Sequence, residues 1–592
     1  MSAQSPQSPQ AVFADAERAF AAGRFAEARA GLVRLEQMGL NHAAVHHLRG
    51  LVEHRLGEFA AADRYFEAAR GLQPDDAQIL NNHGNLLRAI GRREAAMAAY
   101  DRALALAPDL ADAILNQALL LTDLGRVEEA RAGFLAMTRL RPDDSRGWAG
   151  LGALELAAEK LDAAAAAYDR ALALAPTNPT VANGVARVAM LRGDSDALDR
   201  YGYALSLSPQ ERNLIRDEAD LLSARGDPRA LDRLTETVRA NPEWVTGQIA
   251  LARLRWESGD KEGFRDALEE RLREAPSDTR LWLAYISLLE ACWLEAEAAD
   301  VARRAREAGG DSNRLMLSEA INAGRSGDQA RAAALFAALP AGLPGRSIHE
   351  SIHWIREGDF DRALLLAEAA LRDDHWAVSF WGVLELLYRK TGHARAEWLS
   401  RREGLVATFE LPLARDRFEA VDALLLHLHR NCVECVGQSV REGTQTRWNL
   451  FDRREPELAE LREALEALVA DYLRGLPTRD PTHPLLRHKG HSLGIVTSWS
   501  VRLTGAGRHV SHFHPKGLVS SACYVRVPQI GAESREGWLD LGVPPEDFAM
   551  PLEPLMSVRP EPGRLVLFPS YLLHGTRRFS AGERMSVAFD VA

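Results

Sequence analysis

Cysteine is scarce in this chain, whose 592 residues contain four: Cys292, Cys432, Cys435 and Cys523. Four thiols cannot build the dense disulfide framework of small secreted domains, which favours a reducing compartment. The opening MSAQSPQSPQ has no charged stretch followed by an apolar run, so we expect no secretory leader. No apolar run approaches the roughly 20 residues of a membrane span, so we expect no membrane partner. These absences predict a cytoplasmic protein.

Positive charge is in deficit, because 72 lysine and arginine residues face 83 aspartate and glutamate residues, a formal net charge of −11. Such a chain has no general attraction for nucleic acid, and we expect no nucleic-acid partner. The sequence also lacks the G-x-x-x-x-G-K-[ST] loop of nucleotide-driven enzymes and the G-x-S-x-G elbow of serine hydrolases. A length of 592 residues exceeds a single core and predicts several domains.

Prolines, glycines and aromatic residues recur at a common spacing of 33 or 34 residues over the first half of the chain. The prolines are Pro74, Pro108, Pro142, Pro176, Pro209, Pro242 and Pro276. The glycines are Gly23, Gly57, Gly91, Gly125, Gly193, Gly226 and Gly259, with Glu159 at one position of the row. The aromatic residues are Phe66, Tyr100, Phe134 and Tyr168. A fixed period of this length predicts a repeat architecture.

Each period is typical of two helices, since apolar residues recur at helical spacing on both sides of the glycine. The glycine permits the tight turn, and the proline ends the second helix. From about residue 9 to 310 the chain resembles the tetratricopeptide repeat family, and we interpret 311–404 as degenerate helical repeats. Residues 1–8 are predicted to be disordered. The resemblance implies an all-α solenoid whose groove binds a protein or peptide.

The repeat spacing disappears after residue 404, and we assign 405–592 to a second domain with a helical lead-in. Its β core, from about residue 490 to 592, contains short segments rich in β-branched and aromatic residues between glycines and prolines, as strands are. The segments are 495–504, 518–528, 536–542, 564–574 and 584–592. They predict a double-stranded β-helix, the cupin-like jelly roll, so that the chain is a multidomain α + β protein.

Histidines cluster in this domain, with His509, His512 and His514 close together and His574 sixty residues after the last of them. Side chains at i and i+2 of an extended strand point the same way, so His512 and His514 can share one metal ion. A non-heme iron(II) site needs three protein ligands on one face and leaves the other positions open. We expect the third ligand, His574, to come from a neighbouring strand.

The motifs "HFHPKGLVSSACYVRVP", "PGRLVLFPSYLLHGT" and "GERMSVAFDV" resemble the 2-oxoglutarate- and iron(II)-dependent oxygenases. The resemblance covers about residues 430–592 and implies iron(II) and 2-oxoglutarate as cofactors. In this family an arginine holds the far carboxylate of 2-oxoglutarate, because guanidinium and carboxylate form a bidentate pair. Arg584 with Ser586 fits that position. Cofactor contacts are also predicted for Tyr524 and Ser521, and a substrate contact for Arg502.

One departure leaves the ligand set open, because the common family pattern has a carboxylate where this chain has His514. The ligands are then His512, His514 and His574, which we favour, or a set that includes Glu533, Asp540 or His509. The activity predicted is hydroxylation of a protein or peptide recruited by the repeats. The alternatives are a three-histidine cupin dioxygenase that does not use 2-oxoglutarate, and a non-catalytic repeat adaptor with a structural barrel.

Overall fold

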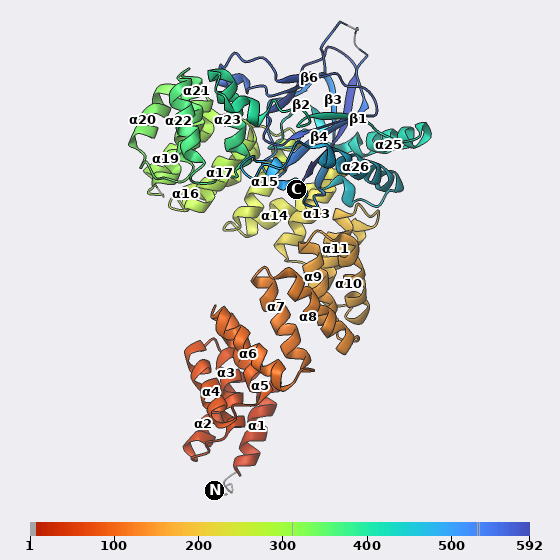
Figure 1. The fold of residues 1–592 in the computed structure, drawn as a ribbon. Helices are drawn as coiled ribbons and strands as arrows, with labels where there is room; N and C mark the ends of the chain where they lie inside the picture. The colour runs from red at the N-terminus through yellow and green to blue at the C-terminus, as the bar shows by residue number, and fades with distance from the viewer. Residues whose placement is uncertain (1–7, 311, 530, 532) are drawn as a thin grey trace. The chain divides into compact units, whose positions relative to one another are not determined.

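The computed structural model of the chain describes residues 8–310, 312–529, 531 and 533–592 (Figure 1). The chain forms two compact units. The first extends to Ala189 and includes Arg200–Ser208, and the second comprises Met190–Asp199 and Pro209–Ala592. Of the segment 1–8, predicted to be disordered, all but Ser8 lies outside the described residues. Among the helices described, none combines the length and the apolar character that a bilayer crossing requires.

The N-terminal part of the chain is a series of helices that pack as consecutive pairs, as predicted for a solenoid. The helices are α1 (Pro9–Ala21), α2 (Phe25–Gln37), α3 (Ala43–Arg55), α4 (Phe59–Leu72), α5 (Ala77–Ala89), α6 (Arg93–Leu106), α7 (Ala111–Asp123), α8 (Val127–Leu140), α9 (Ser145–Ala157), α10 (Leu161–Leu174), α11 (Pro179–Leu191) and α12 (Ala197–Leu207). Glu159, the non-glycine member of the glycine row, has φ +58° and keeps the left-handed turn between α9 and α10.

The predicted aromatic row lies in the core of the first unit. Phe66 and Tyr100 are fully buried. Small residues permit this packing, because a Cβ atom placed on Gly84 would lie 2.6 Å from the ring of Tyr100. Each of the four rings packs against a glycine in this way, so the contact requires both members of the pattern.

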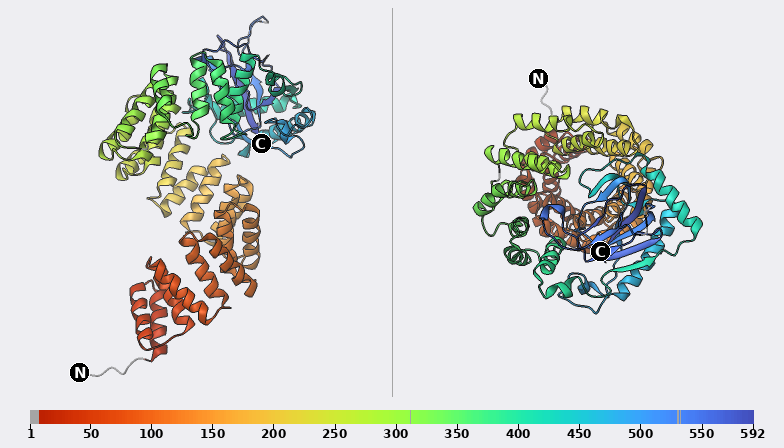
Figure 2. Two further views of the ribbon diagram at one scale, coloured as in Figure 1. Left: turned by 60° about the vertical axis from the view of Figure 1, so that its left-hand side comes forward. Right: turned by 90° about the horizontal axis from the view of Figure 1, so that it is seen from above.

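Helices continue through the first part of the second unit and again pack against their neighbours in the chain. In Figure 2 they run in sequence from yellow to green. They are α13 (Arg212–Ala224), α14 (Asp232–Ala240), α15 (Val245–Glu257), α16 (Asp266–Glu274), α17 (Thr279–Ala291), α18 (Glu295–Glu307), α19 (Ser312–Arg325), α20 (Gln329–Ala338), α21 (Arg346–Arg356), α22 (Phe360–Ala370), α23 (Val378–Thr391) and α24 (Arg395–Leu399).

The C-terminal part contains two antiparallel sheets, in agreement with the predicted jelly roll. The larger has the order β1-β7-β4-β9-β3-β2 and the smaller the order β6-β5-β8. The strands are β1 (Ala407–Glu410), β2 (Val440–Gln445), β3 (Ile495–His509), β4 (Val519–Arg526), β5 (Leu539–Leu541), β6 (Met556–Val558), β7 (Arg564–Pro569), β8 (His574–Thr576) and β9 (Glu583–Val591). Helices α25 (Arg415–Leu428) and α26 (Pro456–Gly475) complete the domain, and one apolar core joins α23, α25 and α26 to the strands.

Two details of the strand prediction are wrong. The segment 564–574 is not one strand: β7 ends at Pro569, and His574 begins β8 in the other sheet. Proline has no N–H to continue the ladder, and the chain turns after it. The predicted strand position of His512 and His514 is also wrong, because both follow the end of β3. The histidine at 574 therefore reaches the pair from the opposite sheet.

Candidate metal centre and cofactor pocket

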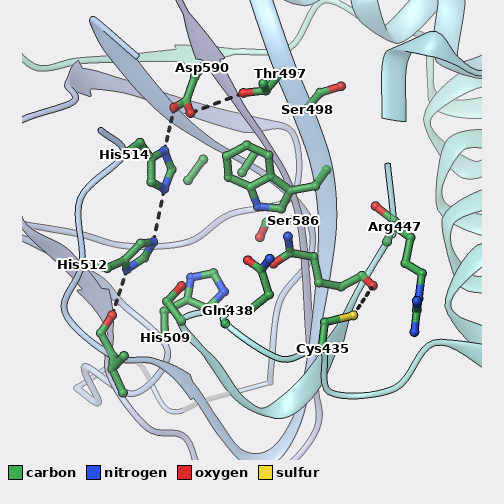
Figure 3. Close-up of a pocket in the computed structure, with 18 of the residues that line it drawn as sticks. Cys435, Gln438, Arg447, Thr497, Ser498, His509, His512, His514, Ser586 and Asp590 are labelled. Atoms are coloured by element: carbon green, nitrogen blue, oxygen red, sulfur yellow. Dashed lines mark hydrogen bonds and ion pairs between the residues drawn. The ribbon is translucent and has the colours of Figure 1, made fainter. Parts of the chain in front are cut away.

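Three histidines converge where the two sheets meet. One ring nitrogen from each of His512, His514 and His574 lies within 4.8 Å of the others. The two Nε2 atoms of His512 and His514 are 3.2 Å apart (Figure 3). The backbones of His512 and His574 form an isolated bridge with N–O distances of 3.0 and 2.9 Å. This bridge joins the segment after β3 to β8 and holds two of the rings side by side.

Each of the three rings has a hydrogen-bond acceptor at Nδ1. His512 donates to the carbonyl of Val510 over 2.9 Å, and His574 donates to the carbonyl of Leu572 over 3.0 Å. The acceptor for His514 is the Asp590 carboxylate, at 2.6 Å. An Nδ1–H donor fixes the tautomer and leaves the lone pair on Nε2, the arrangement found in histidines that bind metals.

Burial favours the neutral form of two of these rings, those of His512 and His574. Desolvation, followed by the neighbouring His514, lowers the pKa of His512 to about 3. Desolvation also lowers the pKa of His574 and of His509 well below the ordinary value. Because a protonated imidazole cannot bind a metal, His512 and His574 are suited to act as metal ligands at neutral pH.

Asp590 is a functional candidate that the sequence reasoning missed. Its buried carboxylate accepts hydrogen bonds from Nδ1 of His514 and from the Ser520 hydroxyl, which is 2.9 Å away. The signal was present, because 584, 586, 588 and 590 alternate along one strand and must share a face. The predicted alternative carboxylates are not brought to the centre: Asp540 pairs with Arg577 at 2.6 Å, and the ligand cluster among the described residues contains neither Asp540 nor Glu533.

Arg584 is a buried cation without a partner of opposite charge. Arg584 is 1% exposed, and among the described residues no carboxylate oxygen lies within the 4.0 Å of an ion pair. Its guanidinium carbon lies 4.9 Å from the centre of the Tyr524 ring, and Nη1 lies 3.5 Å from the Ser586 hydroxyl. Burial lowers the pKa of Arg584. An unpaired buried charge is costly, so this site favours an anion.

Several buried polar atoms in this region have no hydrogen-bond partner. They are Nε of Arg584, Nε2 of His509, Oγ1 of Thr576 and the hydroxyl of Tyr524. Buried polar atoms are paired in the great majority of cases, so a cluster of unpaired ones indicates a ligand site. All but Tyr524 line a cavity of about 840 Å³ that the three convergent histidines and Ser586 also line. We refer to it as the histidine cavity.

Comparison with known proteins agrees with this geometry. Residues 497–590 match a family described as "Putative 2OG-Fe(II) oxygenase". Residues 47–111 and 115–179 match the tetratricopeptide repeat family. The chain carries tetratricopeptide repeats and a domain of this oxygenase family. No curated protein is significantly similar to the chain.

Solved structures similar to the chain include tetratricopeptide proteins. YrrB, described as a tetratricopeptide protein with an unusual peptide-binding site, shares 20% identity over 31% of this chain and 95% of its own, with a TM-score of 0.27. Pseudomonas aeruginosa PilF shares 20% identity over 36% of this chain and 97% of its own, with a TM-score of 0.33. A thermophilic tetratricopeptide protein of Thermus thermophilus shares 22% identity over 29% of this chain and 95% of its own, with a TM-score of 0.26.

Ser521 and Arg502, for which a cofactor contact and a substrate contact were predicted, make other contacts in the structure. The Ser521 hydroxyl borders the histidine cavity but exchanges two 2.8 Å hydrogen bonds with the backbone of Phe589. The structure does not bring Arg502 to the cavity. Arg502 forms an ion pair with Glu583, whereas Trp499, three residues earlier, lines the cavity. Residues an odd number apart on a strand point to opposite faces, which explains the difference.

Helices of the second unit line the other side of the histidine cavity. Asp220, Arg253, Glu257 and Trp293 contribute to its surface. These helices are held to the oxygenase domain by polar contacts, since Arg447 pairs with Glu257 at 2.5 Å and the Gly437 amide donates to the carbonyl of Ala291 over 3.0 Å. The space beside the histidines is therefore enclosed by both the strands and the helical array.

Proposed function

We propose that the protein is an iron(II)- and 2-oxoglutarate-dependent oxygenase that hydroxylates a protein or peptide. The proposal depends on one observation: ring nitrogens of three histidines converge in the same cavity that a buried, unpaired arginine lines. The family match supports the same assignment.

The donor set fits iron(II). Imidazole nitrogens suit iron, and three protein ligands, two from the segment after β3 and one from β8, would leave the other positions open. The bonds at Nδ1 to Val510, Leu572 and Asp590 orient the three rings before a metal arrives. We therefore assign His512, His514 and His574 as the ligands, with Asp590 as a positioning residue for His514.

The second part of the cavity fits 2-oxoglutarate. Arg584 offers an unpaired guanidinium that packs against the Tyr524 ring, and Ser586 offers a hydroxyl group beside it. A dicarboxylate bound here neutralises the buried charge and satisfies the unpaired donors, which stabilises the complex. When bound, iron(II) and 2-oxoglutarate supply the oxidising power that inserts an oxygen atom of O₂ into a C–H bond, with succinate and CO₂ as the other products.

The chain's own residues then position the reactants and exclude water. Arg584 would hold the far carboxylate of 2-oxoglutarate, and the three histidines would hold iron(II), in the same cavity. Because residues of the helical array line the same cavity, a substrate that reaches the histidines lies beside the array. Repeat arrays bind extended peptides in their grooves, which favours a protein or peptide substrate. The corresponding domains are 9–310, 311–404 and 405–592.

A second candidate is a three-histidine dioxygenase that does not use 2-oxoglutarate. The absence of a carboxylate from the ligand cluster of the described residues favours it, whereas the unpaired Arg584 favours 2-oxoglutarate. Oxygen uptake by the iron-loaded protein separates the two. The first candidate requires that uptake depend on 2-oxoglutarate and release succinate. Oxygen uptake that depends on a substrate but not on 2-oxoglutarate would identify the second candidate. If the protein binds no iron, it is an adaptor.

A further inference from the structure

A second cavity lies beside the metal centre and is rich in arginine. Its volume is about 650 Å³, and its lining includes His512. Helices of the array and the segments around β2 and β3 enclose it. Four arginines line it, Arg325, Arg356, Arg441 and Arg508, together with three acidic residues, Glu295, Glu546 and Asp547. We refer to it as the arginine cavity.

Two of these arginines lie directly opposite each other on neighbouring strands. Arg441 of β2 is the register partner of Arg508 of β3. Like charges at directly opposed positions of an antiparallel pair repel each other and destabilise the sheet. The backbone is also irregular here, because a bulge follows Arg441 and Glu442 has φ +54°. An arrangement that costs stability in two ways is retained most often where it serves a ligand.

The hydrogen bonds of this pair are incomplete. Arg441 donates through Nη1 to the carbonyls of Gln438 and Val440, at 2.9 and 2.6 Å, while its buried Nη2 has no partner. Arg508 has a buried Nε without a partner, and its only ion pair among the described residues is with Glu546 at 3.5 Å. The side chain of Glu546 is 85% exposed, so solvent screens that pair strongly.

The other charged residues around the arginine cavity do not neutralise Arg441 and Arg508. Asp547 is occupied by Arg356, at 2.6 Å. Among the described residues, neither Glu295 nor Arg325 has an ion pair within 4.0 Å. The pKa of His349, another lining residue, is lowered to about 4 by burial, so its ring is neutral at pH 7. With four cationic and three anionic side chains, one positive charge of the lining has no counterpart.

Trp293 connects this cavity to the histidine cavity, because it lines both. It occupies the position 34 residues after Gly259, where the earlier repeats carry their turn glycine. Its backbone has φ +62°, a conformation that glycine adopts freely and tryptophan does not. The guanidinium of Arg441 stacks 3.8 Å from its ring centre, and the residue remains 44% exposed. The ring therefore fixes one arginine and faces open space.

We propose that Arg441, Arg508 and Trp293 form a binding site for an oxyanion group of the substrate, a carboxylate or a phosphorylated side chain. Paired arginines with free N–H groups bind such groups through charge-assisted hydrogen bonds. Since His512 borders both cavities, an anionic residue bound here lies beside the proposed metal centre, next to the residue that reacts. The assignment of this group to a substrate rests on the proposed oxygenase function, whereas the anion site itself does not.

The test is fluorescence anisotropy of labelled decapeptides added to the full-length protein without iron. Three peptides share one scaffold and carry glutamate, phosphoserine or glutamine at its central positions. We expect the anionic peptides to bind more tightly than the glutamine peptide, and the stronger of the two identifies the source of the oxyanion. Arg508→Gln and Arg441→Gln should each weaken that binding about tenfold or more. Arg415→Gln, which removes an exposed arginine on α25, should leave it unchanged.

Thermal unfolding separates a binding role from a structural one. Arg508→Gln relieves the cross-strand repulsion and removes only a solvent-screened ion pair, so its unfolding midpoint should stay the same or rise. Trp293→Gly restores the turn residue of the other repeats and should weaken peptide binding without lowering the midpoint. Equal binding of the three peptides, or loss of binding in Arg584→Met but not in Arg508→Gln, would overturn the assignment. Because no iron is present, failure here is distinct from failure of the oxygenase proposal.

Discussion

The carboxylate of Asp590 accepts a hydrogen bond from Nδ1 of His514 over 2.6 Å. Asp590 and Arg584 both belong to β9, six residues apart, so they share a face of the strand. One strand therefore positions a proposed iron ligand with one residue and offers the proposed 2-oxoglutarate anchor with another. This relationship links the geometry of the metal centre to that of the cofactor pocket.

Asp590→Asn should weaken iron(II) binding by about 10- to 100-fold, since outer-shell partners of ligating histidines have effects of that size. The amide keeps the bond to Ser520 possible but removes the negative charge that supports the His514 ring. Iron affinity measured by competition with a chelator tests this, and unfolding midpoints control for the fold. An unchanged affinity would show that Asp590 has only a structural role.

His574→Ala should abolish stoichiometric iron(II) binding, because two of the proposed ligands cannot complete the set. His509→Gln provides the matched control. His509 lines the same cavity but is not part of the convergent cluster, so its variant should retain one iron per chain. Iron content after anaerobic loading and desalting gives the answer. If His574→Ala keeps its iron and His509→Gln loses it, the ligand set has been assigned wrongly.

Arg584→Met should weaken 2-oxoglutarate binding by about two orders of magnitude or more, because two charge-assisted hydrogen bonds are lost. The same variant should be at least as stable as the wild type without cofactor, since an unpaired buried charge has been replaced by an apolar side chain. Arg502→Met is the control, because Arg502 pairs with Glu583 outside the cavity. A lowered midpoint with unchanged 2-oxoglutarate affinity would place the anchor elsewhere.

Acid should destabilise the second unit through buried histidines away from the metal centre. Burial lowers the pKa of His429 and of His483 to about 4, from an unfolded value of 6.5. Between these values the unfolded chain binds protons that the folded chain does not, so the free energy of unfolding falls as pH drops from about 6.5 to about 4. His429→Gln should reduce this dependence, whereas the exposed His427→Gln should not. Urea unfolding at pH 5 and pH 7 measures the change in the free energy of unfolding between these pH values. An equal change in the wild type and both variants would contradict the prediction.

The repeats were predictable because their signal is local. A turn glycine, a helix-ending proline and an aromatic residue at one period describe contacts between adjacent helices, and the buried Phe66 and Tyr100 confirm them. The same row also pointed to Trp293: extending it by 34 residues from Gly259 reaches a tryptophan at a position that requires positive φ. The sequence shows this departure from the repeat. It does not show that Arg441 stacks on the Trp293 ring.

The site was only partly predictable, because strand pairing depends on distant segments. The convergence of His512, His514 and His574 follows from motif spacing, and the structure brings them together, although the strand assignment of 564–574 was wrong. The facing of Arg441 and Arg508 depends on the register of β2 with β3 and on the bulge after Arg441. Neither the register nor the bulge is encoded in a local pattern, so this pair could not be inferred from spacing.

The central claim is that three histidines and Arg584 hold iron(II) and 2-oxoglutarate together. The most direct measurement is anaerobic addition of both to the purified protein, recording the visible charge-transfer absorption of the chelated complex. We expect the band to appear with one iron and one 2-oxoglutarate per chain, to disappear in His574→Ala, and to require far more 2-oxoglutarate in Arg584→Met. Stoichiometric iron binding without the band would contradict the claim and favour the three-histidine dioxygenase, and no iron binding would contradict both.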